Sequence, residues 1–95
     1  MPMPSYRLAH IREHGQDMLL FPVADRFGQM SSNDQNALLR ELEMRAHAAG
    51  LAGSAAVFWR HGRHEHFMGP QPWHPFLRSV GMDFVESNIN QELSW

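Results

Sequence analysis

The clearest structural signal in this sequence is a helix, written SNDQNALLRELEMRAHAAG over residues 32–50. Ser32 and Gln35 match a capping box, in which two side chains satisfy backbone N–H groups that the first turn leaves without partners. Gly50 can adopt the left-handed conformation that commonly ends a helix, so we expect the helix to run to about Ala49. Its apolar side chains form one stripe that can lie on a sheet: Leu38, Leu39, Leu42, Ala46 and Ala49.

Two β-hairpins are expected, one on each side of this helix. Residues 6–13 with 18–23, and residues 54–59 with 63–68, read as pairs of strands, and a His-Gly dipeptide lies between the members of each pair. Glycine provides the positive φ that a tight hairpin turn requires. The pattern predicts an α+β domain of order ββαββ, in which a four-stranded antiparallel sheet carries the central helix on one face.

The last part of the chain has a different character. Residues 69–75 contain three prolines and predict a rigid loop, because proline cannot continue a helix interior or a central strand. A short helix is expected at 76–80, with Gly81 as its end. Residues 83–93 fit a helical period and a strand period equally, and a short C-terminal helix is the favoured alternative.

Length and composition indicate a single globular domain spanning residues 1–95. The hydrophobic fraction of 43% is large enough to form a core, and the absence of cysteine excludes disulfides and thiolate zinc sites. A net charge of -2 disfavours non-specific binding to nucleic acid. Residues 1–5 read as a flexible arm without the features of a secretory signal, and no apolar run reaches the length of a membrane span. We expect a cytoplasmic protein.

Histidine and arginine dominate the basic side chains. All eight Lys and Arg positions hold Arg, and seven histidines accompany them. His64 and His66 point to the same side of a predicted strand, so with His61 from the turn or His10 from a neighbouring strand they form a candidate metal site of three histidines. A polar strand that faces solvent explains the same pattern more simply. The metal site is therefore an alternative, and we expect no cofactor.

Catalysis and nucleic-acid binding receive less support from the residues. The sequence has no glycine-rich phosphate loop, nucleophile elbow or HExxH helix, so we do not expect an enzyme. Arginines interleaved with aromatic side chains on the two hairpins fit a single-stranded nucleic-acid site, which is a second alternative: Arg7, Arg12, Arg60 and Arg63. Acidic residues on the same hairpins weaken that positive field.

The proline-rich loop holds the most unusual aromatic residues. Trp73 and Phe76 stand between prolines, which suits either an interface anchor or a plug for the open end of the sheet. Trp95 presents the same choice at the C-terminus. Interfaces favour arginine and tryptophan over lysine. The expected partner-binding residues are Trp73, His74, Phe76, Arg60, Arg63 and Trp95.

Three short motifs carry a resemblance: AAGLAG at 48–53, PWHPF at 72–76 and LSW at 93–95. With them the chain resembles small uncharacterised proteins of proteobacterial genomes and mobile elements. The resemblance implies a compact accessory protein that acts by binding, and it brings no activity with it. The sequence thus predicts a small non-enzymatic protein-binding module, such as an inhibitor or adaptor of a larger bacterial complex encoded by a phage or plasmid. A homodimer formed through an exposed strand edge is a close variant.

Overall fold

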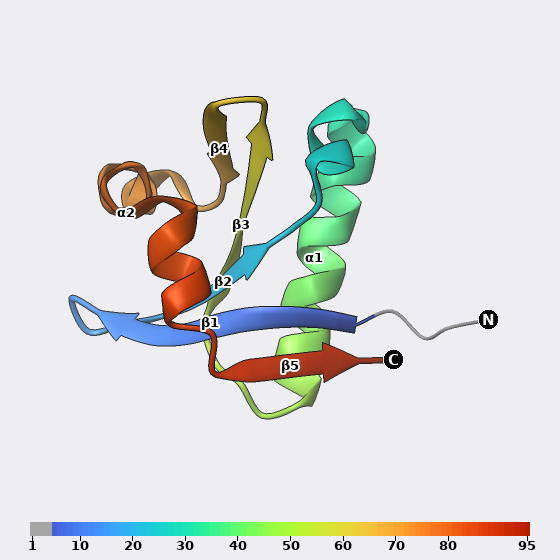
Figure 1. Cartoon of the computed structure of the whole chain (residues 1–95). Coiled ribbons are helices and arrows are strands. Elements are labelled where there is room, and N and C mark those ends of the chain that lie inside the picture. The colour runs from blue at the N-terminus through green and yellow to red at the C-terminus, as the bar shows by residue number, and fades with distance from the viewer. Residues whose placement is uncertain (1–4) are drawn as a thin grey trace.

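A computed structural model describes residues 5–95, which form three layers with the sheet between two helices (Figure 1). The elements in chain order are β1 (Ser5–Glu13), β2 (Gln16–Pro22), the 3-10 helix η1 (Asp25–Gln29), α1 (Ser32–Ala48), β3 (Ser54–His61), β4 (His64–Met68), the 3-10 helix η2 (Gln71–Trp73), α2 (His74–Ser87) and β5 (Gln91–Ser94). The fold is α+β, as expected. The predicted N-terminal arm lies outside the described residues except for Ser5, which begins β1.

The sheet has five strands in the order β4-β3-β2-β1-β5, and it is mixed. β2 and β3 are parallel, with Met18 opposite Ser54 and Pro22 opposite Phe58. The prediction of a four-stranded antiparallel sheet is therefore wrong in strand number and in this pairing. The reason is geometric: α1 spans roughly 25 Å at 1.5 Å per residue, close to the length of β2, so it returns the chain to the end where β2 began.

The C-terminal helix expected over residues 83–93 continues only to Ser87, and a fifth strand follows it. α2 ends at Ser87, and β5 pairs antiparallel with β1 from Ser5 opposite Ser94 to Leu8 opposite Gln91. The Asn90 side chain fixes the start of this strand, because it accepts the His10 N–H at 2.8 Å and donates to the His10 carbonyl at 2.9 Å. Pairing with the free edge of β1 thus makes residues 91–94 a strand, although the sequence fits a helical period and a strand period equally.

Gly81 divides α2 into two helical segments, as the predicted stop at this glycine implied. Its φ of 72° and ψ of 178° are not helical. The Glu65 carboxylate on β4 accepts the Met82 N–H at 2.8 Å, so it satisfies the first donor after the break. The proline-rich segment is shorter as a loop than predicted, because η2 covers residues 71–73 and His74 already begins α2.

Both faces of the sheet are buried. On the α1 side the core consists of Leu8, Leu19, Phe21, Phe27, Leu42, Ala46, Ala55, Val57 and Leu93. On the α2 side it consists of Ala9, Met18, Leu20, Ala56, Phe58, Trp73, Leu77, Met82 and Val85. This double burial explains why the sequences of β2 and β3 hold unbroken apolar runs at 18–21 and 55–58 instead of alternating.

α1 begins at Ser32 as expected, but the predicted capping box of Ser32 with Gln35 does not form. The cap is Ser31, not Ser32, and its hydroxyl accepts the Asp34 N–H at 3.1 Å. The Gln35 amide donates to the Phe27 carbonyl at 2.8 Å, which ties α1 to η1. At the other end Gly50 has a φ of 86°, and two N–H···O=C bonds complete a Schellman motif: Gly50 to His47 at 3.0 Å and Leu51 to Ala46 at 2.9 Å.

Replacement of the cap tests this assignment. Ser31→Ala should lower the free energy of unfolding by about 1 kcal/mol, because the Asp34 N–H loses its acceptor. Ser32→Ala is the matched control and should change stability by less than about 0.5 kcal/mol. Urea denaturation of both variants measures the difference. A larger loss for Ser32→Ala would contradict the cap at Ser31.

Replacement of Gly81 tests the break in α2. Gly81→Ala should cost roughly 1–3 kcal/mol of unfolding free energy, because glycine alone occupies this backbone region without strain. An added Cβ would also lie 2.8 Å from the Glu65 Oε1. Gly62→Ala is the comparison, since Gly62 has a φ of +63° but open space around a Cβ. Thermal unfolding should show the greater loss for Gly81→Ala, and equal losses would argue against the Glu65 contact.

Candidate functional site

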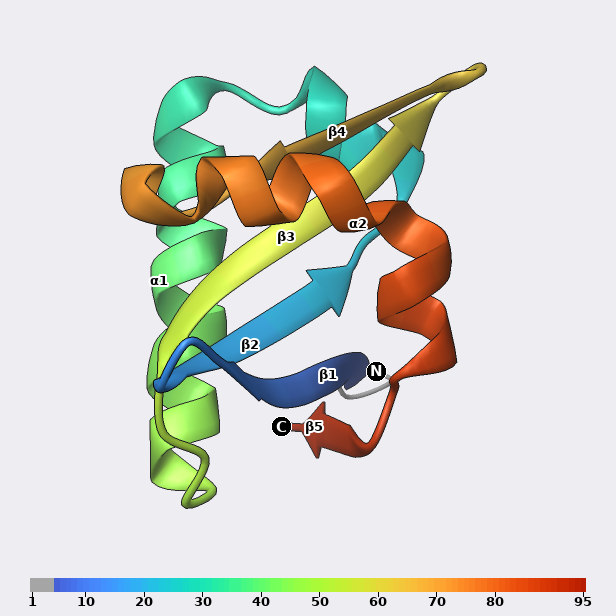
Figure 2. The same ribbon diagram turned by 90° about the vertical axis from the view of Figure 1, so that its left-hand side faces the viewer.

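The tip of the β3–β4 hairpin is the longest run of exposed residues in the described part of the chain, residues 5–95. Residues 61–66 are all exposed, and the tip extends past the helices (Figure 2). β4 is an outer strand of the sheet, so one of its edges has no strand beside it. The turn therefore presents side chains and free backbone groups together.

One face of the hairpin carries histidines on an aromatic support. Trp59 pairs with His66 and His61 pairs with His64 across the two strands. Because side chains alternate along a strand, these residues share the face that α1 covers further along the sheet. The His66 ring stacks on the Trp59 indole at 5.6 Å with an angle of 22°, and the indole packs against Phe27 at 4.8 Å.

The predicted metal cluster does not form in the described part of the chain. His61, His64 and His66 share a face, but residues 5–95 contain no group of three His, Cys, Asp or Glu side chains placed to hold a metal ion. His10 lies on β1, which β2 and β3 separate from β4. The alternative in which His10 completes the set is therefore wrong, because two strands lie between β1 and β4.

Arg60 and Arg63 occupy different environments. The Arg60 guanidinium is half-buried and lies 2.9 Å from an Asp83 oxygen and 3.8 Å from a Glu65 oxygen. It thus connects β3, β4 and α2, and its charge is already paired. Arg63 is exposed at the turn, and none of the ion pairs among residues 5–95 involves it. Arg63 is the arginine of this hairpin that remains available to a partner.

The aromatic loop packs inward. Trp73 is 7% exposed and its indole N–H donates to the Gln16 side-chain oxygen at 2.7 Å. Of the two alternatives for Trp73, the structure therefore corresponds to the plug at the end of the sheet and not to the exposed interface anchor. His74 is half-buried beside the Phe67 ring at 5.2 Å, with its Nε2 3.1 Å from the Gly69 carbonyl. Phe76 is half-buried against Phe84 at 6.1 Å.

Trp95 lies on the body of the domain at the opposite edge of the sheet. Its ring stacks on Tyr6 at 5.5 Å with an angle of 18°, and the Arg45 guanidinium lies 5.0 Å from the ring centroid. β5 and β4 are the two outer strands. The expected partner-binding residues thus do not form one surface, because Trp95 and Arg63 belong to different edges.

The arginines of the two hairpins are also separated. In the parallel arrangement β3 starts beside the start of β2, so the β1–β2 turn and the β3–β4 turn lie at opposite ends of the sheet. Arg12 lies near the first turn, 3.7 Å from Asp17, whereas Arg63 is at the second. The idea that these arginines gather at one end, on which the single-stranded nucleic-acid site depended, is wrong.

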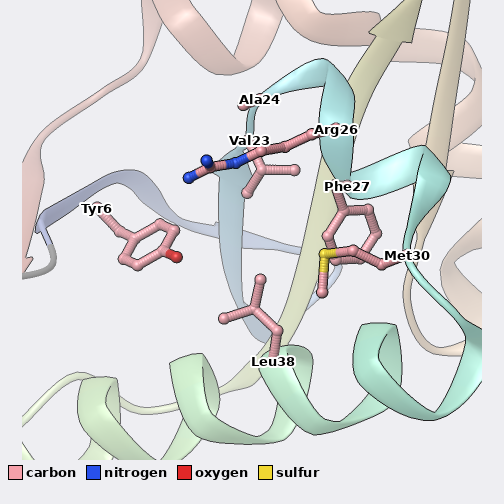
Figure 3. A pocket seen from close by; sticks show the side chains of 7 residues that line it. All are labelled: Tyr6, Val23, Ala24, Arg26, Phe27, Met30 and Leu38. Atoms are coloured by element: carbon pink, nitrogen blue, oxygen red, sulfur yellow. The ribbon is translucent and has the colours of Figure 1, made fainter.

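A pocket that the sequence did not indicate lies on the α1 side of the sheet (Figure 3). Its volume is about 350 Å³, and its lining comes from β1, the segment between β2 and α1, and α1 itself: Tyr6, Val23, Ala24, Arg26, Phe27, Met30 and Leu38. The sequence signal for it is the presence of Val23, Phe27 and Met30 in the short stretch before α1. No local pattern could link them to Tyr6.

Comparisons with known proteins find no family model, no curated protein and no solved structure that matches the chain. Among the helices of residues 5–95, none is both long and apolar enough to cross a membrane.

Substitution of Trp73 tests its place in the core. Trp73→Ala should lower the unfolding free energy by about 3–5 kcal/mol, because it leaves a cavity under α2. Trp73→Phe keeps most of the ring contacts and loses the bond to Gln16, for a cost of about 1 kcal/mol from the bond itself. Chemical denaturation measures both. If Trp73→Ala were as stable as the parent chain, Trp73 would be a surface anchor and not a core residue.

Proposed function

We propose that this chain is a small non-enzymatic protein-binding module that binds a larger protein through the β3–β4 hairpin and the free edge of β4. The observation that carries the proposal is the uninterrupted exposure of residues 61–66 on an outer strand. Exposed edges are usually shortened, covered or charged to prevent unwanted pairing, and an edge that stays open suits the addition of a strand from a partner.

The backbone of β4 supports this mode of binding. His61 and His64 flank a two-residue turn, so they form a hydrogen-bonded pair, and the next pair of Arg60 and Glu65 is not hydrogen-bonded across the strands. The Glu65 N–H and carbonyl therefore point away from β3, towards the open side. Arg60 anchors this strand to α2 through Glu65 and Asp83, so the edge is held in place before a partner arrives.

The charges of the hairpin favour an acidic, extended partner segment. Glu65 is already used by Arg60 and by the Met82 N–H, whereas Arg63 has no ion pair within residues 5–95. His61, His64 and His66 add hydrogen-bonding ring nitrogens beside it. A carboxylate beside the added strand would meet Arg63 in a charge-assisted hydrogen bond.

The binding surface suits the role of an inhibitor or adaptor. An inhibitor or adaptor of a larger bacterial complex needs only such a binding surface, and the resemblance to small proteins of mobile elements favours that role. A second copy of the chain is an alternative occupant of the same edge. The absence of catalytic motifs from the sequence is the reason for proposing binding without catalysis.

Charge reversal at the hairpin tests the proposal. The double variant Arg63→Glu/His64→Glu should weaken capture of the partner roughly tenfold or more, because it repels an acidic segment, and it should fold normally because both side chains are exposed. Affinity capture from nuclease-treated extracts of the native host, followed by titration of the purified partner, measures the effect.

Arg40→Glu is the matched control, because Arg40 is exposed on α1 and away from the hairpin. It should leave partner binding unchanged. Equal binding by the hairpin variant and the control would refute the assignment of the surface. Light scattering of the free chain separates the alternatives, since a concentration-dependent dimer lost only in the hairpin variant would identify a second copy as the occupant.

A further inference from the structure

We propose that the pocket between β1, η1 and α1 binds a small amphipathic monocarboxylate, with an apolar chain or ring inside the pocket and the carboxylate at Arg26. This site is separate from the β3–β4 hairpin and does not depend on the proposed protein partner. Its volume of about 350 Å³ falls within the usual range of small-molecule pockets, roughly 300–1,000 Å³.

The walls of the pocket are apolar and held in place. Val23, Met30 and Leu38 line it from different parts of the chain (Figure 3). Phe27 is 2% exposed and packs on Trp59, and its carbonyl accepts the Gln35 amide of α1. A cavity with fixed apolar walls binds an apolar group at a lower cost than one that must first form.

The polar groups of the lining select an anion. Arg26 is the one charged side chain among the lining residues, and no ion pair within residues 5–95 involves it. Figure 3 shows its guanidinium reaching over the hollow that also receives the Tyr6 hydroxyl. A guanidinium presents a planar pair of donors that matches a carboxylate, and a phenol adds a third donor.

Other ligand chemistries fit less well. No carboxylate lines the pocket, so a cation would meet Arg26 with no compensating charge. A neutral polar ligand such as a sugar would leave its hydroxyls against Val23, Met30 and Leu38, where they would lose hydrogen bonds to water. An apolar body with one anionic group is the chemistry that satisfies both parts of the lining.

Octanoate and 3-phenylpropanoate are suitable probes, with octan-1-ol and octylammonium as matched neutral and cationic probes. In two-dimensional ¹⁵N NMR titrations, at least one carboxylate should produce saturable shifts centred on the amides of Tyr6 and residues 24–30. Tyr6 stacks on Trp95, so indole fluorescence gives a second readout. The alcohol should bind more weakly, and the ammonium more weakly still. The comparison of the two carboxylates distinguishes a chain from a ring as the preferred apolar group.

Variants separate the charge from the cavity. Arg26→Gln should weaken carboxylate binding roughly tenfold and leave alcohol binding unchanged, because it removes a charge-assisted bond. Arg40→Gln makes the same change on the exposed side of α1 and should alter neither. Ala24→Leu, at an exposed lining position, should weaken both probes by filling the mouth while the domain stays folded.

Three affinity results would each overturn the proposal, and so would one result on the location of the site. The affinity results are the absence of saturable shifts with both carboxylates, equal affinity for octanoate and octylammonium, and unchanged carboxylate affinity in Arg26→Gln. Shifts that map to residues outside the lining would place the site elsewhere and overturn it as well. None of these outcomes bears on the hairpin variant, so the two proposals fail or succeed separately.

Discussion

The parallel pairing of β2 with β3 is the constraint on which the remaining structure depends. Because α1 returns the chain to the start of β2, the two hairpin turns lie at opposite ends of the sheet. The same crossover leaves β1 with a free edge for β5 and makes β4 the other outer strand. Both central strands then need cover on both faces, and α1 and α2 provide it (Figure 1). The exposed hairpin follows directly from this arrangement.

A small polar cluster connects that hairpin to the second helical layer. Glu65 accepts the Met82 N–H where Gly81 interrupts α2, and Arg60 lies between Glu65 and Asp83. The Asp83 side chain is 89% exposed, so this ion pair contributes little to stability by itself. The cluster instead fixes positions. Glu65 holds the start of the second helical segment through the Met82 N–H, and Arg60 lies between Glu65 and Asp83. The edge of β4 is thereby fixed relative to α2.

Local signals in the sequence predicted the features that local interactions determine. The end of α1 at Gly50, the stop at Gly81 and the turn at Gly62 each depend on a few neighbouring residues. Strand pairing does not depend on neighbouring residues. β5 pairs with β1, which lies near the other end of the sequence, and the alternating residues of β5 fit a helical period equally well. Double burial was visible as the unbroken apolar runs of β2 and β3, which indicate a covered parallel pair more than a half-exposed hairpin.

The candidate sites divide in the same way. Arg63 and its neighbouring histidines were found because a turn exposes whatever it carries, whereas the pocket combines Tyr6 with residues that only tertiary folding brings near it. Trp59 relates the two surfaces. Its indole packs on Phe27 of the pocket wall and supports His66 of the hairpin, and it lies so close to Gly28 that an added Cβ there would be 2.6 Å from its ring nitrogen. An indole enclosed on these sides keeps one position, so the aromatic support shared by both surfaces is formed before binding.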